Sequence, residues 1–253
     1  MQRVIFSLSF TNKLFDMKFS RITLIMAMDD EAKPIIQELG LLYKGKLLDP
    51  LPMEYYEGNY KSLRVDLVTS GKCDRYNVDH IGPQAAILNT ATAVGRLQPE
   101  LIINPGTAGG FIKAGGAIGD VYLSYPMICY HDRRIPIPGF DAYGVGSYYC
   151  YDTREIAKNL GLKTGIVSTG SSLDFTDKDL ELIDSFGGVV KEMEAASIAW
   201  VADLYKTPFF AIKSITDLVD GSTPTEQEFL KNLSSASVAL SREVMRVLDY
   251  LAE

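Results

Sequence analysis

Cysteine and histidine are scarce in this sequence. Its three cysteines, Cys73, Cys129 and Cys150, form no C-x-x-C pair and are too few to give a chain of 253 residues a disulfide framework. Of its two histidines, His80 and His131, neither has a second histidine four residues away or a cysteine pair nearby. The sequence therefore predicts a protein of the reducing cytoplasm that holds no metal ion.

Long apolar runs and an excess of basic residues are also missing. The longest strand-like runs have seven or eight residues, whereas a membrane-spanning helix needs roughly 18 or more. With 25 Lys and Arg against 32 Asp and Glu, the formal net charge is -7, so the chain as a whole repels a polyanion. We therefore expect neither a membrane-spanning segment nor a nucleic-acid partner.

Nucleotide-binding fingerprints are absent as well. No G-x-G-x-x-G sequence occurs. The segment Gly40-Leu-Leu-Tyr-Lys-Gly-Lys46 departs from the phosphate-binding loop, because Leu47 stands where Ser or Thr would hold magnesium. We interpret Gly40 as the end of a helix that a turn follows. The sequence predicts no cofactor.

The chain length suits one large domain, which we place at residues 17–253. Residues 1–16 contain a short apolar stretch, yet Lys13 and Asp16 follow it and no small-residue cleavage site is evident. We expect an N-terminal extension that is poorly ordered, or a start site assigned too early with Met17 as the alternative. A weak signal peptide is the second interpretation.

Strand and helix patterns alternate along the whole chain, which predicts an α/β fold with helices covering a parallel or mixed sheet. Thr176 and the segment Thr223-Pro224-Thr-Glu226 are expected to cap two helices, the latter with proline at the first helical position. Strands are predicted at 22–28, 55–58, 63–70, 100–104, 121–130, 163–168 and 208–215. Helices are predicted at 30–39, 83–97, 176–186, 193–205 and 224–251.

Acidic residues or a glycine cluster follow several predicted strands. Asp29-Asp30-Glu31 follows the first, Pro105-Gly-Thr-Ala-Gly-Gly110 the fourth and Thr216-Asp217 the last, while Glu192-Met193-Glu194 leads an alanine-rich helix. Ligands of open α/β sheets bind beyond the carboxyl ends of the strands, so these segments are expected to meet around one small molecule. Plainer interpretations stay open, namely helix capping for the acids and a tight turn for the glycines.

Two features are harder to explain as capping or turns. Asp217 ends a strongly apolar strand, where an ionised group needs a specific partner or a ligand that shares its proton. The segment that starts at His131 carries Ile135, Ile137 and Phe140, and loops rarely expose such side chains without a partner. We expect this loop to dock on the core of its own chain or on a second subunit.

Taken together, the motifs strongly resemble those of the 5′-methylthioadenosine (S-adenosylhomocysteine) nucleosidases, a family of the purine-nucleoside phosphorylase superfamily. The resemblance extends from about residue 18 to the C-terminus, and the loop 131–146 and the segment 216–221 resemble the plant-type branch. The matching segments, in the same order as in the family, are Ala27-Met-Asp-Asp-Glu31, Asn104-x-Gly-Thr-Ala-Gly-Gly110, Ser168-Thr-Gly170, Glu192-Met-Glu-Ala195 and Ser214-Ile-Thr-Asp217.

The resemblance implies a three-layer αβα sandwich around a twisted mixed sheet, and a homodimer in which the loop 131–146 of one subunit completes the other's pocket. It also implies that Glu31 activates water, that Asp217 protonates adenine at N7, and that Glu194 accepts hydrogen bonds from the ribose hydroxyls. The other substrate-binding positions that it implies are Met28 and Met193 beside the ribose, Thr107, Ala108 and Gly109 along ribose and base, Leu173 and Asp174 toward the purine, Glu192 next to these acids, and Ile135, Ile137 and Phe140 in the loop. Leu173 stands where bacterial relatives carry an aromatic residue.

The residue types fit this chemistry on their own. Breaking an N-glycosidic bond builds positive charge on the sugar and negative charge on the base. One group must therefore protonate the base, and another must orient and activate the water. Asp29, Asp30 and Glu31 would repel phosphate, which favours hydrolysis over phosphorolysis. A purine-nucleoside phosphorylase and a non-catalytic storage protein of the same fold are the alternatives. Whether S-adenosylhomocysteine is a second substrate stays open.

Overall fold

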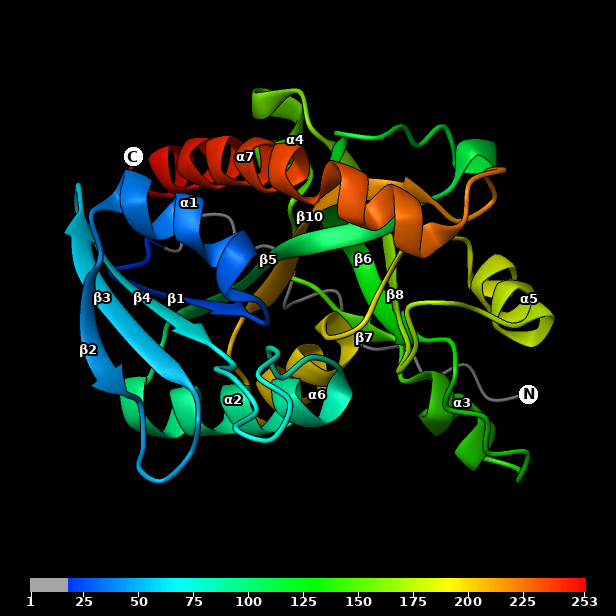
Figure 1. Cartoon of the computed structure of the whole chain (residues 1–253), viewed down its shortest axis with the longest axis horizontal. Coiled ribbons are helices and arrows are strands. Elements are labelled where there is room, and N and C mark those ends of the chain that lie inside the picture. The colour runs from blue at the N-terminus through cyan, green and yellow to red at the C-terminus, as the bar shows by residue number, and fades with distance from the viewer. Residues whose placement is uncertain (1–17) are drawn as a thin grey trace.

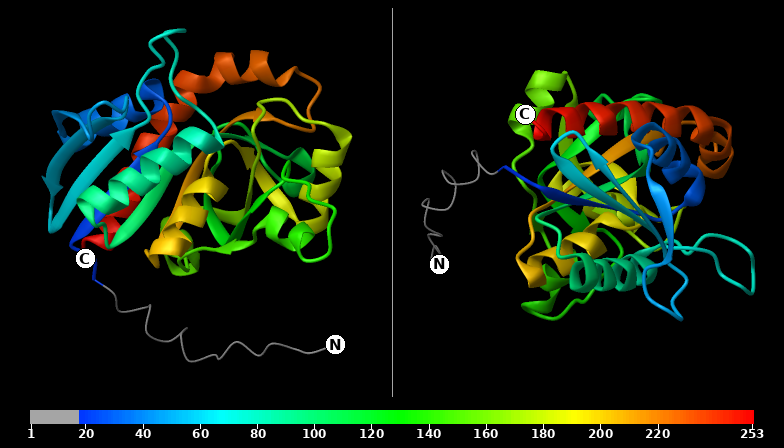
Figure 2. Two further views of the ribbon diagram at one scale, coloured as in Figure 1. Left: turned by 90° about the horizontal axis from the view of Figure 1, so that it is seen from below. Right: turned by 90° about the vertical axis from the view of Figure 1, so that its left-hand side faces the viewer.

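The computed structural model describes residues 18–253 and contains one ten-stranded mixed sheet (Figure 1). The extension predicted at 1–16 lies outside the described residues. Helices cover both faces of the sheet: α1 and α7 lie on one side and α2 and α6 on the other (Figures 1 and 2). The α/β class with a mixed central sheet is thus confirmed.

Strands occupy all seven predicted positions, although β5 and β10 continue past their predicted ends, and β2, β7 and β9 were not predicted. The strands are β1 (Arg21–Met26), β2 (Leu42–Lys46), β3 (Glu54–Tyr60), β4 (Leu63–Thr69), β5 (Leu101–Gly110), β6 (Val121–Tyr130), β7 (Tyr148–Tyr149), β8 (Lys163–Thr169), β9 (Gly188–Glu192) and β10 (Phe209–Leu218). The helices are α1 (Asp29–Leu39), α2 (Pro83–Leu97), α3 (Phe140–Val145), α4 (Arg154–Leu160), α5 (Asp177–Phe186), α6 (Ala195–Tyr205) and α7 (Thr225–Leu251), with a 3₁₀ turn at Ile112–Ala114.

Capping residues explain where several helices begin and end. Gly40 ends α1 in the left-handed conformation, at φ 61°, as predicted. Thr176 caps α5 and forms a reciprocal capping box with Asp179, which confirms the predicted start. The predicted capping box before α7 is wrong: Pro224 itself is the N-cap residue, and no side chain caps the helix.

The sheet partly closes on itself, which no pattern in the sequence indicates. Strand β10 pairs with both β5 and β6, and β8 links β6 to β9, which returns to β5. The expected end of the fourth strand at residue 104 is wrong, because Pro105 to Gly110 continue β5 between β10 and β9. The glycine cluster is therefore the middle of a closed sheet.

Two apolar clusters occupy the two faces of the sheet. One contains Phe210 and the side chains of α1 and α7, and the other contains Ile102 with the side chains of α2 and α6. Within residues 18–253, no helix combines the length and the apolar character that crossing a membrane requires. The closed part of the sheet brings the ends of β1, β5, β9 and β10 to one place, where the cavity of the next section lies.

Candidate active site

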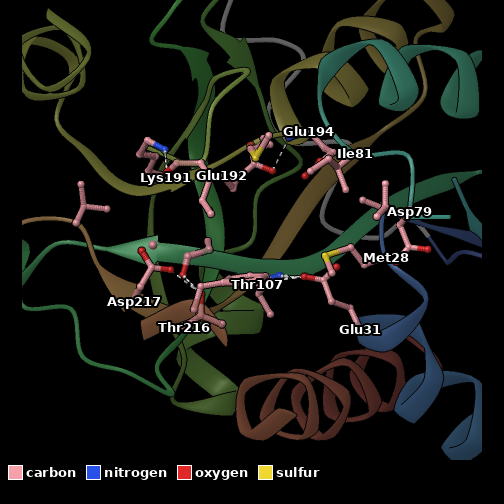
Figure 3. A pocket seen from close by; sticks show the side chains of 18 of the residues that line it. Met28, Glu31, Asp79, Ile81, Thr107, Lys191, Glu192, Glu194, Thr216 and Asp217 are labelled. Carbon is pink, nitrogen blue, oxygen red and sulfur yellow. Dashed lines mark hydrogen bonds between the residues drawn. The ribbon is translucent and has the colours of Figure 1, made fainter. Parts of the chain in front are cut away.

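A cavity of about 570 Å³ opens where β5, β9 and β10 meet the start of α1. The predicted acids Glu31, Glu194 and Asp217 all line it, and Figure 3 places Glu31 and Asp217 at opposite ends of one wall. The lining residues are Ala27, Met28, Glu31, Lys72, Asn77, Val78, Asp79, Ile81, Thr107, Ala108, Gly109, Leu173, Lys191, Glu192, Met193, Glu194, Thr216, Asp217, Val219 and Phe229.

Glu31 stands in the first turn of α1, directly after β1, and its side chain is buried against β5. The Thr107 amide donates to Glu31 Oε1 at 2.8 Å, and the Thr107 hydroxyl donates to the same oxygen. Burial raises the pKa of Glu31 above its ordinary value, although the Thr107 hydroxyl and the nearby Lys213 ammonium favour the ionised form. Glu31 is therefore a carboxylate held in a fixed orientation and well suited to accept a proton.

Asp217 lies within β10, at a point where the pairing with β5 shifts register. The irregularity turns its side chain into the cavity, and the Thr216 hydroxyl donates to Asp217 Oδ1 at 2.7 Å. Burial raises the pKa of Asp217, with the Thr216 hydrogen bond and the Lys191 charge opposing it. The site thus favours a protonated Asp217 more than water does.

The glycines of β5 make room for side chains from the neighbouring strands. A Cβ atom on Gly109 would lie 2.7 Å from Asp217 Oδ2 and 2.7 Å from Val219 Cγ2. A Cβ atom on Gly106 would lie 3.0 Å from Lys213 Nζ. The missing side chains of these two glycines therefore leave room for Asp217 and Lys213, in the middle of a strand and not in the turn that the sequence suggests.

Glu192 and Glu194 differ in what they bind, although they are two residues apart. Glu192 ends β9, and its carboxylate accepts from Lys213 Nζ at 2.9 Å and from the Ala195 amide at 2.9 and 3.0 Å. The helix predicted from 193 therefore begins only at Ala195, with the Glu192 carboxylate at its N-terminus. Burial disfavours ionised Glu192, yet the Lys213 charge and its hydrogen bonds leave the pKa of Glu192 below its ordinary value.

Glu194 faces the cavity with one strong partner. The Gly82 amide, at the start of α2, donates to Glu194 Oε1 at 2.7 Å. Burial, followed by the charge of Glu192, raises the pKa of Glu194 to about 7. Glu194 therefore retains acceptor capacity for a ligand, whereas the carboxylate of Glu192, predicted as substrate-binding, is occupied by the protein itself.

The other predicted positions divide into two groups. Met28, Thr107, Ala108, Gly109, Leu173 and Met193 line the cavity. Asp174, Ile135, Ile137 and Phe140 do not line the cavity of their own chain. Ile137 and Phe140 are each 55% exposed, so the loop 131–146 does not dock both side chains on its own core.

Sequence reasoning missed two lysines and one loop. Lys213 is almost fully buried within β10, and Lys191 lies in β9 on the cavity wall. A single lysine within the apolar run Phe209–Leu218 is the signal that would have revealed Lys213. The segment 70–82 projects from the sheet (Figure 2) and contributes Asp79 and Ile81 to the cavity; its sequence has no pattern that announces this role.

We predict that Gly109→Ala reduces turnover of the expected nucleoside by about 10²-fold, because the added methyl group displaces the Asp217 carboxylate. Turnover and thermal unfolding should be measured together. Gly95→Ala in α2 is the matched control: a Cβ there meets no atom within 4 Å, so activity should not change and stability should rise by about 0.5–1 kcal/mol. A Gly109→Ala enzyme with normal turnover would contradict this account of the glycine.

Comparison with known proteins identifies the family. Residues 21–249 match the model of the phosphorylase superfamily. The chain is 41% identical over 237 residues to an Arabidopsis thaliana 5′-methylthioadenosine/S-adenosylhomocysteine nucleosidase, covering 92% of both chains. A second Arabidopsis relative, a 5′-methylthioadenosine nucleosidase, is 41% identical over 234 residues, with 92% and 87% coverage.

Solved structures agree with the sequence matches. The structure of Arabidopsis thaliana 5′-methylthioadenosine nucleosidase in apo form superposes with a TM-score of 0.91 at 40% identity, covering 93% of this chain and 97% of the other. The matched range of the family model, residues 21–249, includes β1, α1, β5, β9 and β10, which meet at the cavity. The chain therefore belongs to the 5′-methylthioadenosine/S-adenosylhomocysteine nucleosidase family of the phosphorylase superfamily.

Proposed function

We propose that this protein hydrolyses the N-glycosidic bond of 5′-methylthioadenosine and releases adenine and 5-methylthioribose. The observation that carries the proposal is the placement of two buried carboxyl groups, Glu31 and Asp217, at opposite ends of one cavity (Figure 3). A cavity of about 570 Å³ lies within the range of small-molecule sites. The activity of the Arabidopsis relatives, at 41% identity, supports the same substrate.

Asp217 acts as the acid in the proposed reaction. As the bond between C1′ and N9 breaks, its electron pair moves to the base, and the proton of the Asp217 carboxyl group passes to N7. Burial raises the pKa of Asp217, which keeps part of this group protonated where a free aspartate would be ionised. Adenine then leaves as a neutral molecule.

Glu31 acts at the sugar. A water molecule attacks C1′ as the positive charge develops there, and Glu31 accepts the proton that the water loses. The two Thr107 hydrogen bonds orient the carboxylate, so its second oxygen is free to hold the water. Because Glu31 must be ionised and Asp217 protonated, activity requires a pH between the pKa values of the two groups in the complex.

Glu194 is the proposed acceptor for the ribose hydroxyls. Its carboxylate lines the cavity near Ile81 (Figure 3), and among the described residues only the Gly82 amide donates a hydrogen bond to it. Met28 and Met193 supply apolar contact beside the sugar. A ribose between these groups would place C1′ near Glu31.

No observation favours phosphorolysis. The buried cation next to Glu31 is Lys213, and its ammonium is already paired with Glu192 at 2.9 Å. Glu31, Glu192 and Glu194 together would repel a phosphate anion. The presence of Glu31, Glu194 and Asp217 in one cavity also argues against a non-catalytic storage protein.

We predict that Asp217→Asn lowers adenine release from 5′-methylthioadenosine by at least about 10²-fold, because an amide has no proton to give. Release should be followed by absorbance without added phosphate, alongside S-adenosylhomocysteine as a second substrate. Asp203→Asn, an exposed site at the end of α6, is the matched control and should keep full turnover. If the wild-type protein needs phosphate and forms a sugar 1-phosphate, the hydrolase proposal is wrong.

We predict that kcat/KM falls as the pH drops through about 7, because the pKa of Glu194 is raised to about 7 and its protonated form accepts fewer hydrogen bonds. The fall should steepen toward lower pH, where Glu31, whose pKa burial raises, is protonated as well. In Glu194→Gln one of these two ionisations is gone, so the fall becomes shallower and KM rises at high pH. Glu226→Gln, on the exposed first turn of α7, should reproduce the wild-type profile. If Glu194→Gln leaves the pH dependence of kcat/KM unchanged, Glu194 is not the acceptor for the ribose hydroxyls.

We also propose a homodimer in which the loop 131–146 approaches the partner's pocket. Arg133 stacks on Tyr130 at 4.5 Å and on Tyr143 at 5.1 Å, which fixes the loop while Ile137 and Phe140 stay exposed. A folded loop that exposes apolar side chains fits a subunit interface. We also propose a cytoplasmic location, because the three cysteines are free thiols, as is usual in a reducing compartment.

We predict that Phe140→Asp shifts the protein from dimer to monomer in analytical ultracentrifugation and raises KM, because a charge at this position cannot be buried between subunits. Leu42→Asp is the control: Leu42 is 64% exposed on β2, which lies at the far side of the molecule from α3 (Figure 1). A wild-type protein that sediments as a monomer would contradict the proposal, as would a Phe140→Asp dimer with normal KM.

A further inference from the structure

Gly109 is the centre of a row of three residues across the closed sheet. It pairs with Lys191 of β9 on one side and with Asp217 of β10 on the other. Directly paired residues in a sheet project from the same face, and the Lys191 and Asp217 side chains both line the cavity. Because Gly109 has no side chain, the space between the lysine and the acid stays open toward the ligand.

Lys191 is buried, and its ammonium group has defined partners. Its Nζ atom donates to the Ser172 carbonyl at 2.9 Å and to the Leu173 carbonyl at 2.9 Å. It forms no ion pair among residues 18–253, so a buried positive charge is balanced only by carboxylates at longer range. The segment that it holds includes Leu173, which lines the same cavity.

We propose that Lys191 is a positioning residue for departure of the base. It fixes the Leu173 segment against the purine, and its charge stabilises the Asp217 carboxylate that forms when the proton passes to the base. This inference rests on the proposed hydrolysis and adds a residue to which the sequence analysis assigns no role. Lys191 does not need to touch the substrate to act in this way.

The charge balance of the proton transfer explains why a cation helps at this place. Before the step, Asp217 is a neutral acid; after it, the proton is on N7, the electron pair of the glycosidic bond is on the base, and Asp217 carries a negative charge. A positive charge across Gly109 is attracted only to the second state. Lys191 thus makes Asp217 a stronger acid at the moment of bond cleavage.

Other charged groups near Lys191 and Asp217 also shift the pKa values of these two residues. Burial raises the pKa of Asp217, the Lys191 ammonium lowers it, and Glu228 on α7 raises it. Burial lowers the pKa of Lys191, while Asp217, Asp174, Asp179 of α5 and Glu192 favour its charged form. Burial, followed by the Lys191 charge, lowers the pKa of His131 to about 4, so His131 is neutral near pH 7. Lys191 is therefore the cation that faces Asp217 across the cavity.

Removing this charge should have two opposite effects on the pH profile. Without Lys191, Asp217 is a weaker acid, so the plateau of kcat should fall by about threefold or more. The same change keeps Asp217 protonated to higher pH, so the alkaline limb should move upward by about one pH unit. The profiles of wild type and variant should therefore approach or cross at high pH. A purely structural defect would lower the profile without moving the limb.

The test compares Lys191→Met with Lys191→Arg and the wild type, with kcat and KM for 5′-methylthioadenosine measured from pH 5 to pH 10. We expect the limb to move upward in Lys191→Met, KM to rise because the Leu173 segment loses two hydrogen bonds, and Lys191→Arg to return the limb toward the wild-type position. Lys206→Met is the matched control, since it removes one lysine charge from the exposed end of α6 and should leave the limb in place. Thermal unfolding verifies that each variant is folded, and Lys191→Gln replaces Lys191→Met if the latter does not fold.

The outcomes separate this inference from the proposed function. A wild-type protein that releases no adenine contradicts the proposed function itself. A wild-type protein that does, with a folded Lys191→Met variant whose alkaline limb coincides with that of the wild type, overturns the inference and leaves the hydrolase proposal standing. A limb that moves downward overturns it as well, because the sign of the charge effect would be wrong.

Discussion

The ion pair between Lys213 and Glu192 is the interaction on which the rest of the site depends. Both side chains are almost fully buried, and Nζ lies 2.9 Å from Oε2. Removing one partner of such a pair leaves an uncompensated charge and costs about 3–5 kcal/mol. The pair also joins the strand that carries Asp217 to the strand that leads into Glu194, and the Glu192 carboxylate accepts a hydrogen bond from the amide of Ala195, the first residue of α6. The Lys213–Glu192 ion pair therefore stabilises the fold and also positions the residues of the site.

Because only Glu192 pairs with Lys213, the pKa values of the neighbouring carboxyl groups Glu192, Glu31 and Glu194 shift in different directions. Glu192 takes the lysine and stays ionised, with a pKa below its ordinary value because Lys213 and its hydrogen bonds outweigh the burial. Glu31 and Glu194 are left in the same buried region with only hydrogen bonds and longer-range attraction, so burial raises the pKa of each. A group that accepts a proton or binds a ligand during a reaction needs a pKa that is raised in this way. Because Glu192 takes the Lys213 charge, Glu31 and Glu194 keep such raised pKa values.

The sequence indicated where the acids gather, because the predicted ends of the strands and the start of an alanine-rich helix point to one edge of the sheet. Glu31, Glu194 and Asp217 meet in one cavity as the sequence indicates. The role of Glu192 could not be read in the same way, since its partner Lys213 is 21 residues away and only the closed sheet brings them together. Local patterns likewise end β5 too early, because a glycine run favours a strand only where neighbouring strands fill the missing side-chain volume.

Closure of the sheet also brings the proposed acid Asp217, the proposed base Glu31 and Glu194 into one site. In the proposed reaction the substrate is neutral, the sugar becomes positive and the base becomes negative. In the proposed complex, Glu31 and Glu194 lie where the sugar would bind, and the row of Lys191, Gly109 and Asp217 lies where the base would bind. Charges of opposite sign therefore face the two halves of the breaking bond, and each interaction strengthens as the bond opens. In the proposed mechanism, the acids that would attract the positive sugar would also repel phosphate, so the same arrangement would favour both cleavage and water as the nucleophile.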